Sequence, residues 1–460
     1  DIEHPGFAYW LPFTSMLATI GMYFGGIDYS AAQAGFIFLA ALLPPLTYLI
    51  TFEISRNRRH AWAAAVLMLT GGYYFPAWTM IDGYTPFVLF GLMAFYCFYR
   101  SISDNRPVYA LIGGICVGLA SLTRADAPLL LIAFLLTVLL DRKQLRVSEN
   151  IKPMLLIAAA TLLGYAVAVT PWQIRNLLAF ESSTTLSGLQ TIWLCNYDDL
   201  YSYQKELSLS TWLDCGLAEN LAEKWDAVKR IAITLVKVQG MVFGLPLAIV
   251  GIWQCRNHLL FRLGLIYGFL LVVAMSLVYT LPDMRGSWHH SACLLLPFIF
   301  VAALAGLDRI LDAFAARWER WNDPGTAPFF TVLLCLLAFL MSGLRMQSHL
   351  SDRADARDLT ETFDMAAAYI EADAIVMTTY ITMFRHHTGR RTIAMPNNGL
   401  DAMYAAADRY DARYVIMDEN TPPAINPVFT GELTSERLEL VAGFGEDDSG
   451  MRMSLFRLVD

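Results

Sequence analysis

The sequence predicts an α-helical polytopic membrane protein that ends in a small α/β domain. Of its 460 residues, 56% are hydrophobic and only 16% are charged, whereas soluble domains carry about 25% charged residues. The long apolar runs lie almost entirely in residues 1–344, and residues 345–460 have the composition of an ordinary soluble protein. These two ranges are the predicted domains. The net charge of −8 and the lack of a basic, aromatic-rich patch argue against nucleic-acid binding.

Ten apolar runs suit membrane-spanning helices, because a helix needs about 20 apolar residues to cross the hydrocarbon core. The runs lie near residues 30–52, 60–79, 84–100, 108–123, 125–140, 154–171, 230–253, 262–281, 290–307 and 327–344. Several are short and rich in glycine, and small residues let neighbouring helices approach closely. We therefore expect a tightly packed bundle.

Lysine and arginine are distributed unevenly between the loops that join these runs. One set of alternate loops contains fourteen: Arg56, Arg58, Arg59, Arg100, Arg106, Arg142, Lys143, Arg146, Lys152, Arg256, Arg262, Arg309, Arg317 and Arg320. The opposite short loops contain only Arg124 and Arg285. Because cytoplasmic loops are enriched in these residues, the first set is predicted to be cytoplasmic. The long 172–229 loop and the C-terminal domain are then extracytoplasmic.

The segment 7–26 is apolar enough to span, yet residues 1–29 contain no Lys or Arg. We interpret it as an interfacial or re-entrant helix that follows an external start; a span from a cytoplasmic start is the alternative. Because the sequence begins with Asp1 and not with Met, we expect a further segment upstream, either a signal peptide or one more membrane helix.

Two cysteines, Cys195 and Cys215, share the predicted external loop. An oxidising compartment would allow them to form a disulfide, and two unrelated thiols are the alternative.

The C-terminal domain alternates strand and helix patterns. Strands are expected at 374–379, 391–395, 413–418, 438–444 and 452–458, with helical stretches at 357–370 and 400–410. This alternation is typical of an α/β domain with a partly parallel sheet. It contains no G-x-G-x-x-G, P-loop or C-x-x-C motif, so we predict no cofactor and expect a lid or scaffold.

Ionisable residues avoid the middle of the predicted spans and gather at their outer ends. They are Asp1, Glu3, His4, Asp82, Arg124, Asp126, Arg175, Asp283, Arg285, His289 and His290. Charged groups are costly in a bilayer and mark functional sites there. Transporters place such groups near the midplane, so this pattern favours an enzyme that acts on an amphiphile at the outer interface.

Three of the arginines are candidates for binding an anionic headgroup, because arginine binds phosphate oxygens in a bidentate manner. They are Arg124, Arg175 and Arg285. A structural role is the alternative: Arg124 could pair with Asp126, and Arg175 could anchor its helix at the interface.

Three carboxylates, Asp1, Glu3 and Asp82, are candidates for activating an acceptor hydroxyl. Asp82 could instead cap the helix that follows it. His289 and His290 have no third ligand spaced with them, so no metal site is predicted.

Four motifs in this order resemble those of GT-C glycosyltransferases, which include protein O-mannosyltransferases and aminoarabinose transferases. They are EHPGFAYW at residues 3–10, GLASLTR at 118–124 with Pro128, PWQIRN at 171–176, and Arg285-Gly286 with His290-Ser291 and Leu296-Pro297. The tail, with TGR at 388–390 and RYVIMD at 413–418, resembles the external domain of bacterial members.

The resemblance implies a sugar donor linked to polyprenyl phosphate, transfer on the extracytoplasmic face with inversion, and a location in the plasma (bacterial inner) membrane. The basic residues that match motif positions are His4, Arg124, Arg175, Arg285 and His290. The general base is a carboxylate that usually precedes the H-P motif, so we expect it upstream of Asp1, with Asp1 or Glu3 as substitutes. The sugar, a hexose or a pentose, and the acceptor, a protein, lipid or glycan, stay open.

Two other functions are the alternatives. An O-antigen-ligase-like transferase that uses a diphosphate-linked glycan would favour a large external loop and little C-terminal domain, so the long tail counts against it. A transporter or flippase of lipid-linked sugars would favour inverted repeats and polar midplane residues, and neither of these is evident in the sequence.

Overall fold

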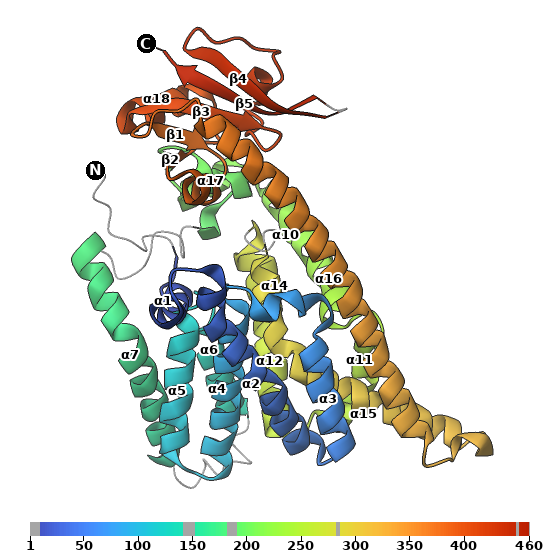
Figure 1. Ribbon diagram of the computed structural model, residues 1–460. Helices are drawn as coiled ribbons and strands as arrows, with labels where there is room; N and C mark the ends of the chain where they lie inside the picture. The colour runs from blue at the N-terminus through green and yellow to red at the C-terminus, as the bar shows by residue number, and fades with distance from the viewer. Residues whose placement is uncertain (1–9, 141–151, 182–190, 282–285, 448–449, 460) are drawn as a thin grey trace. The chain divides into compact units, whose positions relative to one another are not determined.

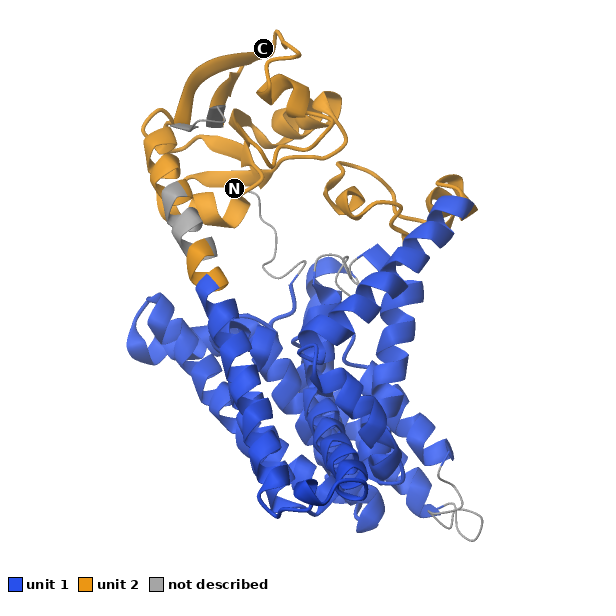
Figure 2. Ribbon diagram, turned by 90° about the vertical axis from the view of Figure 1, so that its right-hand side faces the viewer, with its two compact units in different colours: residues 1–192, 218–347 blue, residues 193–217, 348–460 orange. Residues whose placement is uncertain are grey.

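The computed structural model describes residues 10–140, 152–181, 191–281, 286–447 and 450–459. The chain forms two compact units, coloured separately in Figure 2. Unit 1 comprises residues 1–192 and 218–347, and unit 2 comprises residues 193–217 and 348–460. Unit 2 is therefore made from two separate pieces of the sequence.

Unit 1 is a helical bundle (Figure 1). Its helices are α1 Phe13–Gly25, α2 Tyr29–Ser55, α3 Arg58–Thr70, α4 Tyr84–Ser103, α5 Pro107–Ser121, α6 Leu129–Leu140, α7 Lys152–Phe180, α10 Leu217–Thr234, α11 Gly244–Cys255, α12 Leu259–Val273, α14 Ser287–Ala292, α15 Leu296–Ala315 and α16 Thr326–Ala367. Helix α16 continues across the boundary into unit 2.

Six helical segments among the described residues are long and apolar enough to cross a membrane, and the bent pair α10–α11 makes a seventh. The predicted ten spans are therefore not confirmed. The runs at 60–79, 108–123 and 125–140 form helices of 13, 15 and 12 residues. At 1.5 Å per residue these helices rise only about 18–23 Å, less than the hydrocarbon thickness of about 30 Å.

The run at 60–79 is interrupted by Gly71 and Gly72. Both have positive φ angles, 66° and 56°, which glycine adopts without strain. Helix α3 ends at Thr70, and the chain continues in two short 3-10 helices, Gly72–Tyr74 and Pro76–Thr79. This irregular segment brings aromatic side chains to the end of the bundle.

Helix α1 has 13 residues, too few to span. Figure 1 shows it nearly end-on, whereas α5 and α7 run along the bundle. The interfacial position predicted for the segment 7–26 stays a prediction, and residues 7–9 of that segment lie outside the described residues.

Small residues bring α5 and α7 into backbone contact. A Cβ atom on Gly114 would lie 2.0 Å from the Thr161 carbonyl oxygen, and one on Gly164 would lie 2.1 Å from the Leu111 carbonyl oxygen. A side chain at either glycine would force the helices apart, as expected of small-residue packing in membranes.

Unit 2 contains the predicted α/β domain with a partly parallel sheet. The strands are β1 Ile375–Thr378, β2 Arg391–Ala394, β3 Ala412–Asp418, β4 Leu438–Asp447 and β5 Gly450–Leu458, in the order β2-β1-β3-β5-β4. Strands β1, β2 and β3 are parallel, and β5 pairs antiparallel with both β3 and β4. Buried residues pack on both faces of the sheet, alongside α17 Ile381–Thr388 and α18 Leu400–Tyr410.

The segment 193–217 belongs to unit 2 because it binds the loop after β2. Asn398 exchanges two hydrogen bonds with the backbone of Tyr203: the Tyr203 N–H donates to Oδ1 over 2.9 Å, and Nδ2 donates to the carbonyl over 3.0 Å. The neighbouring Asn397 donates from its backbone N–H to the Tyr201 carbonyl over 3.1 Å. Of the two alternatives for Cys195 and Cys215, the disulfide is the one present, and it closes this segment.

Candidate functional site

The structure describes four of the predicted site residues: Asp82, Arg124, Arg175 and His290. The other four, Asp1, Glu3, His4 and Arg285, lie outside the described residues. Three of the four described residues gather in one place.

His290 and Asp82 form the centre of this cluster. Asp82 lies in the turn before α4, and His290 lies on α14; Nε2 of His290 is 3.2 Å from Oδ2 of Asp82. The ring of Tyr84 stacks on the imidazole with centroids 3.8 Å apart. The Asp82 and His290 side chains remain 39% and 20% exposed, so a ligand can reach both.

The hydrogen bonds of His290 constrain its charge. Its Nδ1 lies 2.7 Å from the carbonyl oxygen of Gly286, and its Nε2 faces the Asp82 carboxylate. Both partners are acceptors, and only the imidazolium donates from both ring nitrogens. The geometry therefore fits a positively charged His290 beside an ionised Asp82.

The surroundings of Asp82 hold its carboxyl group ionised. Burial raises the pKa of Asp82, but the hydrogen bond and charge of His290, the Gly83 N–H and the charge of Arg124 together lower it below the ordinary value. A carboxylate with a lowered pKa stays negative at neutral pH but is a weak proton acceptor. The alternative role of Asp82, as a side-chain cap of α4, is not observed, because no side chain forms a cap hydrogen bond at the start of this helix.

Arg124 comes from the turn between α5 and α6. Its Nε lies 3.0 Å from Oδ1 of Asp126 and 3.0 Å from Oγ of Ser291, and its Nη2 donates to the Ser287 carbonyl over 3.2 Å. The Ser291 hydroxyl in turn donates to Asp126. Arg124 is thus paired with Asp126, as the structural alternative predicted, and this network ties the α5–α6 turn to α14.

The cluster leaves part of the Arg124 guanidinium available. Its Nη1 forms no hydrogen bond with any residue that the structure describes, and the side chain is 16% exposed. A Cβ atom on Gly83 would lie 3.2 Å from Cγ2 of Thr123 and 3.7 Å from Cγ of Arg124. The turn carrying Asp82 therefore packs directly beside Arg124.

Arg175 is held elsewhere, near the end of α7. Its guanidinium lies over the rings of Trp172 and Phe180, 4.8 and 4.9 Å from their centroids, and Nη1 donates to Oδ1 of Asn176 over 3.0 Å. Within the described ranges no hydrogen bond or ion pair joins Arg175 to the Asp82–His290 pair or to Arg124.

Sequence reasoning missed Tyr84 and the role of Ser291. Tyr84 carries no signal beyond being an aromatic residue at the start of a span. Ser291 stood in a motif, but its bond to Asp126 depends on how α14 packs against the α5–α6 turn.

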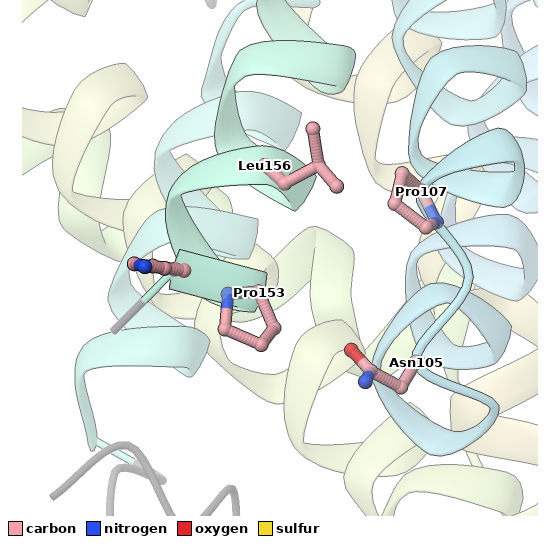
Figure 3. A pocket seen from close by; sticks show the side chains of 5 residues that line it. Asn105, Pro107, Pro153 and Leu156 are labelled. Atoms are coloured by element: carbon pink, nitrogen blue, oxygen red, sulfur yellow. The ribbon is translucent and has the colours of Figure 1, made fainter. Parts of the chain in front are cut away.

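A small hollow lies at the other end of α4 and α5. It has a volume of about 270 Å³ and is lined by Asn105, Pro107, Lys152, Pro153 and Leu156 (Figure 3). Asn105 follows the last residues of α4, whereas Asp82 precedes the first. The hollow is thus separate from the Asp82–His290 pair.

No three His, Cys, Asp or Glu side chains in the described parts of the chain gather so as to hold a metal ion.

Comparisons with known proteins concern the sequence family and the fold. Residues 11–186 match the family model described as dolichyl-phosphate-mannose-protein mannosyltransferase. No curated protein matches the sequence. The fold is similar to that of the archaeal oligosaccharyltransferase AglB from Archaeoglobus fulgidus, solved with an inhibitory peptide and a dolichol-phosphate. The TM-score is 0.54 at 15% identity, and the match covers 89% of this chain and 61% of that one.

The fold is also similar to that of ArnT from Cupriavidus metallidurans, in the apo state and bound to undecaprenyl phosphate. The TM-scores are 0.50 and 0.51 at 11% identity, and each match covers 97% of this chain and 87% of that one. At these identities the likeness to the two proteins shows the fold alone. The family-model match over residues 11–186 agrees with the resemblance seen in the sequence motifs.

Proposed function

We propose that the protein is a membrane glycosyltransferase that moves a sugar from a polyprenyl-phosphate-linked donor to an acceptor on the extracytoplasmic face. The observation that carries this proposal is the convergence of Asp82, Arg124 and His290 at one end of an apolar bundle. Two of these residues lie in the range that matches the family model. Two similar structures contain dolichol-phosphate or undecaprenyl phosphate, which supports this donor class.

In this proposal the cations bind the lipid phosphate. Arg124 presents a partly exposed guanidinium, and His290 adds a second positive charge whose orientation Asp82 maintains. Nη1 of Arg124 would donate a charge-assisted hydrogen bond to the phosphate, which is roughly twice as strong as a neutral one. Both ring nitrogens of His290 face Gly286 and Asp82, so His290 would act on the phosphate through its charge. Arg175, Arg285 and His4 remain proposed contributors.

Inverting transfer needs a carboxylate that accepts the proton of the attacking hydroxyl. The candidates are Asp1, Glu3 and Asp82, or an acidic residue upstream of Asp1. The lowered pKa of Asp82 suits an electrostatic role better than proton abstraction. We therefore place Asp82 beside His290 as its anionic partner and assign the base to an acidic residue upstream of Asp1, with Asp1 or Glu3 as substitutes.

The test is a transfer assay with the full-length protein in lipid nanodiscs and a panel of polyprenyl-phosphate hexoses and pentoses. We expect release of free polyprenyl phosphate with at least one donor, and no release by Arg124→Ala. Turnover of nucleotide sugars alone would contradict the proposal. Movement of the lipid-linked sugar across vesicles without transfer would favour the transporter.

A further inference from the structure

The other histidine of α14, His289, contacts a second set of residues. Its ring stacks on Tyr73, with centroids 5.4 Å apart and ring planes inclined by 24°. The guanidinium of Arg345, on α16, lies 4.6 Å from the centroid of the Tyr73 ring. Tyr73 thus contacts its neighbours through its ring, and its hydroxyl forms no hydrogen bond with the part of the chain that the structure describes.

Tyr74 contacts the same histidine in a different way. The Tyr74 hydroxyl donates to the His289 carbonyl oxygen over 2.9 Å and accepts from Nε2 of Gln239 over 2.6 Å. Tyr74 and Gln239 are both fully buried. A hydrogen bond in such a dry site is strong, and its loss leaves a buried partner unsatisfied.

Gln239 stands at a break in the bundle. It ends a π-helical turn, Leu235–Gln239, and is followed by Met241 and Val242 with φ angles of 47° and 65°. Helices α10 and α11 meet here at 92°. π-turns and left-handed residues cost free energy and often occur at functional sites.

The segment that carries the two tyrosines is also fixed to α16. The buried Ser342 hydroxyl donates to the Thr70 carbonyl over 2.8 Å and accepts from the Gly72 N–H over 3.1 Å. A Cβ atom on Gly72 would lie 2.7 Å from Sδ of Met241. Ring and hydroxyl contacts therefore hold this segment against α14, and backbone contacts hold it against α16.

We propose that Tyr73, Tyr74 and Arg345 are positioning residues that hold the His289–His290 turn in the orientation in which His290 meets Asp82. This inference rests on the proposed function, because it concerns the same site. The physical reason is the place of α14 in the chain: its six residues form the first part of the helical segment Ser287–Ala315, and a helix end frays unless neighbouring residues hold it.

The two adjacent tyrosines give opposite predictions for the same substitution. Tyr74→Phe removes the hydroxyl that binds the His289 carbonyl and should lower kcat about tenfold, the effect of one buried hydrogen bond. Tyr73→Phe keeps the ring and should retain at least half of the activity, whereas Tyr73→Leu should lose about as much as Tyr74→Phe. Arg345→Met should lower kcat about fivefold.

These variants are compared in the full-length protein in nanodiscs with the polyprenyl-phosphate donor that the wild type uses. The donor KM should change less than twofold, because none of the substituted groups binds the phosphate in this scheme. Arg256→Met is the matched control: it removes a guanidinium that lies 3.3 Å from the Trp253 ring centroid, beyond the other end of α11, and should leave kcat unchanged. Equal thermal unfolding temperatures would show that the variants fold.

A second readout does not depend on turnover. The chain has only eight histidines, so histidine-selective NMR can follow the imidazoles, with His289→Asn and His290→Asn providing the assignments. The His290 signals should shift in Tyr74→Phe and Tyr73→Leu but not in Tyr73→Phe.

The outcomes separate the two proposals. A wild type that transfers no sugar, with the expected NMR shifts, would overturn the proposed function and support the positioning role. Normal kcat and unchanged His290 signals in Tyr74→Phe would overturn the positioning role alone, as would equal losses in Tyr73→Phe and Tyr74→Phe.

Discussion

His290 and Asp82 are 208 residues apart in the sequence, yet Nε2 of one lies 3.2 Å from Oδ2 of the other. The pair joins the turn before α4 to α14. Arg124 packs beside that turn and is tied to α14 through Ser287 and Ser291. Three separate elements thus supply one anionic and two basic groups at the same end of the bundle.

Replacing Asp82 by Asn should reduce kcat about 100-fold or more, because the imidazolium of His290 loses its anionic partner and preorganised charge is a large term in catalysis. The measurement is steady-state transfer from the lipid-linked donor. Asp104→Asn is the matched control. Asp104 lies at the opposite end of α4 in an exposed pair with Arg100, and such pairs contribute little. Similar losses in both variants would remove Asp82 from the site.

Arg124→Ala should weaken binding of polyprenyl phosphate about tenfold or more, since a charge-assisted contact to phosphate is lost. Binding can be measured by native mass spectrometry of the protein in nanodiscs. Ser291→Ala separates the structural role of Arg124 from the binding role. It removes one neutral partner of Arg124 and Asp126 and should cost about 1 kcal/mol of stability with little change in lipid affinity. Unchanged lipid affinity in Arg124→Ala would leave Arg124 as a helix anchor.

Arg175→Ala should abolish sugar transfer while expression stays normal, because arginine at this motif position is proposed to bind the lipid phosphate. Trp172→Leu is the comparison, as it removes a ring that the Arg175 guanidinium covers but keeps the charge, and should reduce transfer less. Undiminished transfer by Arg175→Ala would exclude Arg175 from the site.

Replacing Cys195 and Cys215 together by Ser should loosen the segment 193–217. The bridge closes a loop with a sequence separation of 20, for which chain entropy gives about 3 kcal/mol. Hydrogen exchange should become faster at Tyr203, whose N–H donates to Asn398. Cys335→Ser, a free thiol of unit 1, should leave exchange in this segment unchanged; unaltered protection in the double variant would contradict the role of the disulfide.

Two aspartates of unit 2 should give opposite dependences of stability on pH. Burial raises the pKa of Asp418 above the ordinary 3.8. The contribution of Asp418 to the free energy of unfolding is therefore most favourable below pH 3.8 and falls as the pH rises through the pKa of the folded state. Asp418→Asn should therefore stabilise unit 2 near neutral pH relative to about pH 4.

The hydrogen bond from Arg437 lowers the pKa of Asp408, so its contribution is present above 3.8 and is lost as the pH falls. Asp408→Asn should weaken unit 2 only near neutral pH. Denaturant unfolding at both pH values measures the two variants, and effects of the same sign would contradict this assignment.

The sequence predicted the elements whose signal is local. Apolar length located α2, α4, α7 and α16, and the alternation of strand and helix patterns identified the parallel part of the sheet. The count of spans was not confirmed, because composition alone cannot show that Gly71 and Gly72 adopt left-handed angles and end α3.

The candidate site could be predicted only in part from the sequence. The rule that charges avoid the bilayer interior identified Asp82, Arg124 and His290 individually. Their meeting depends on how α4, α14 and the α5–α6 turn pack, and no spacing in the sequence encodes a contact across 208 residues. The hydrogen bond between Tyr203 and Asn398 could likewise not be predicted from the sequence, since both residues lie in polar segments without periodicity.

Unit 2 is assembled from the segment 193–217, which lies between α7 and α10 in the sequence, and from residues 348–460. A truncated gene that starts at Ser348 would encode the whole sheet but not the segment 193–217, which forms hydrogen bonds with Asn397 and Asn398. Recombination at Ser348 alone would therefore transfer an incomplete unit 2. Expression of unit 2 by itself, or its exchange between homologues, requires both pieces to be carried together through a designed linker.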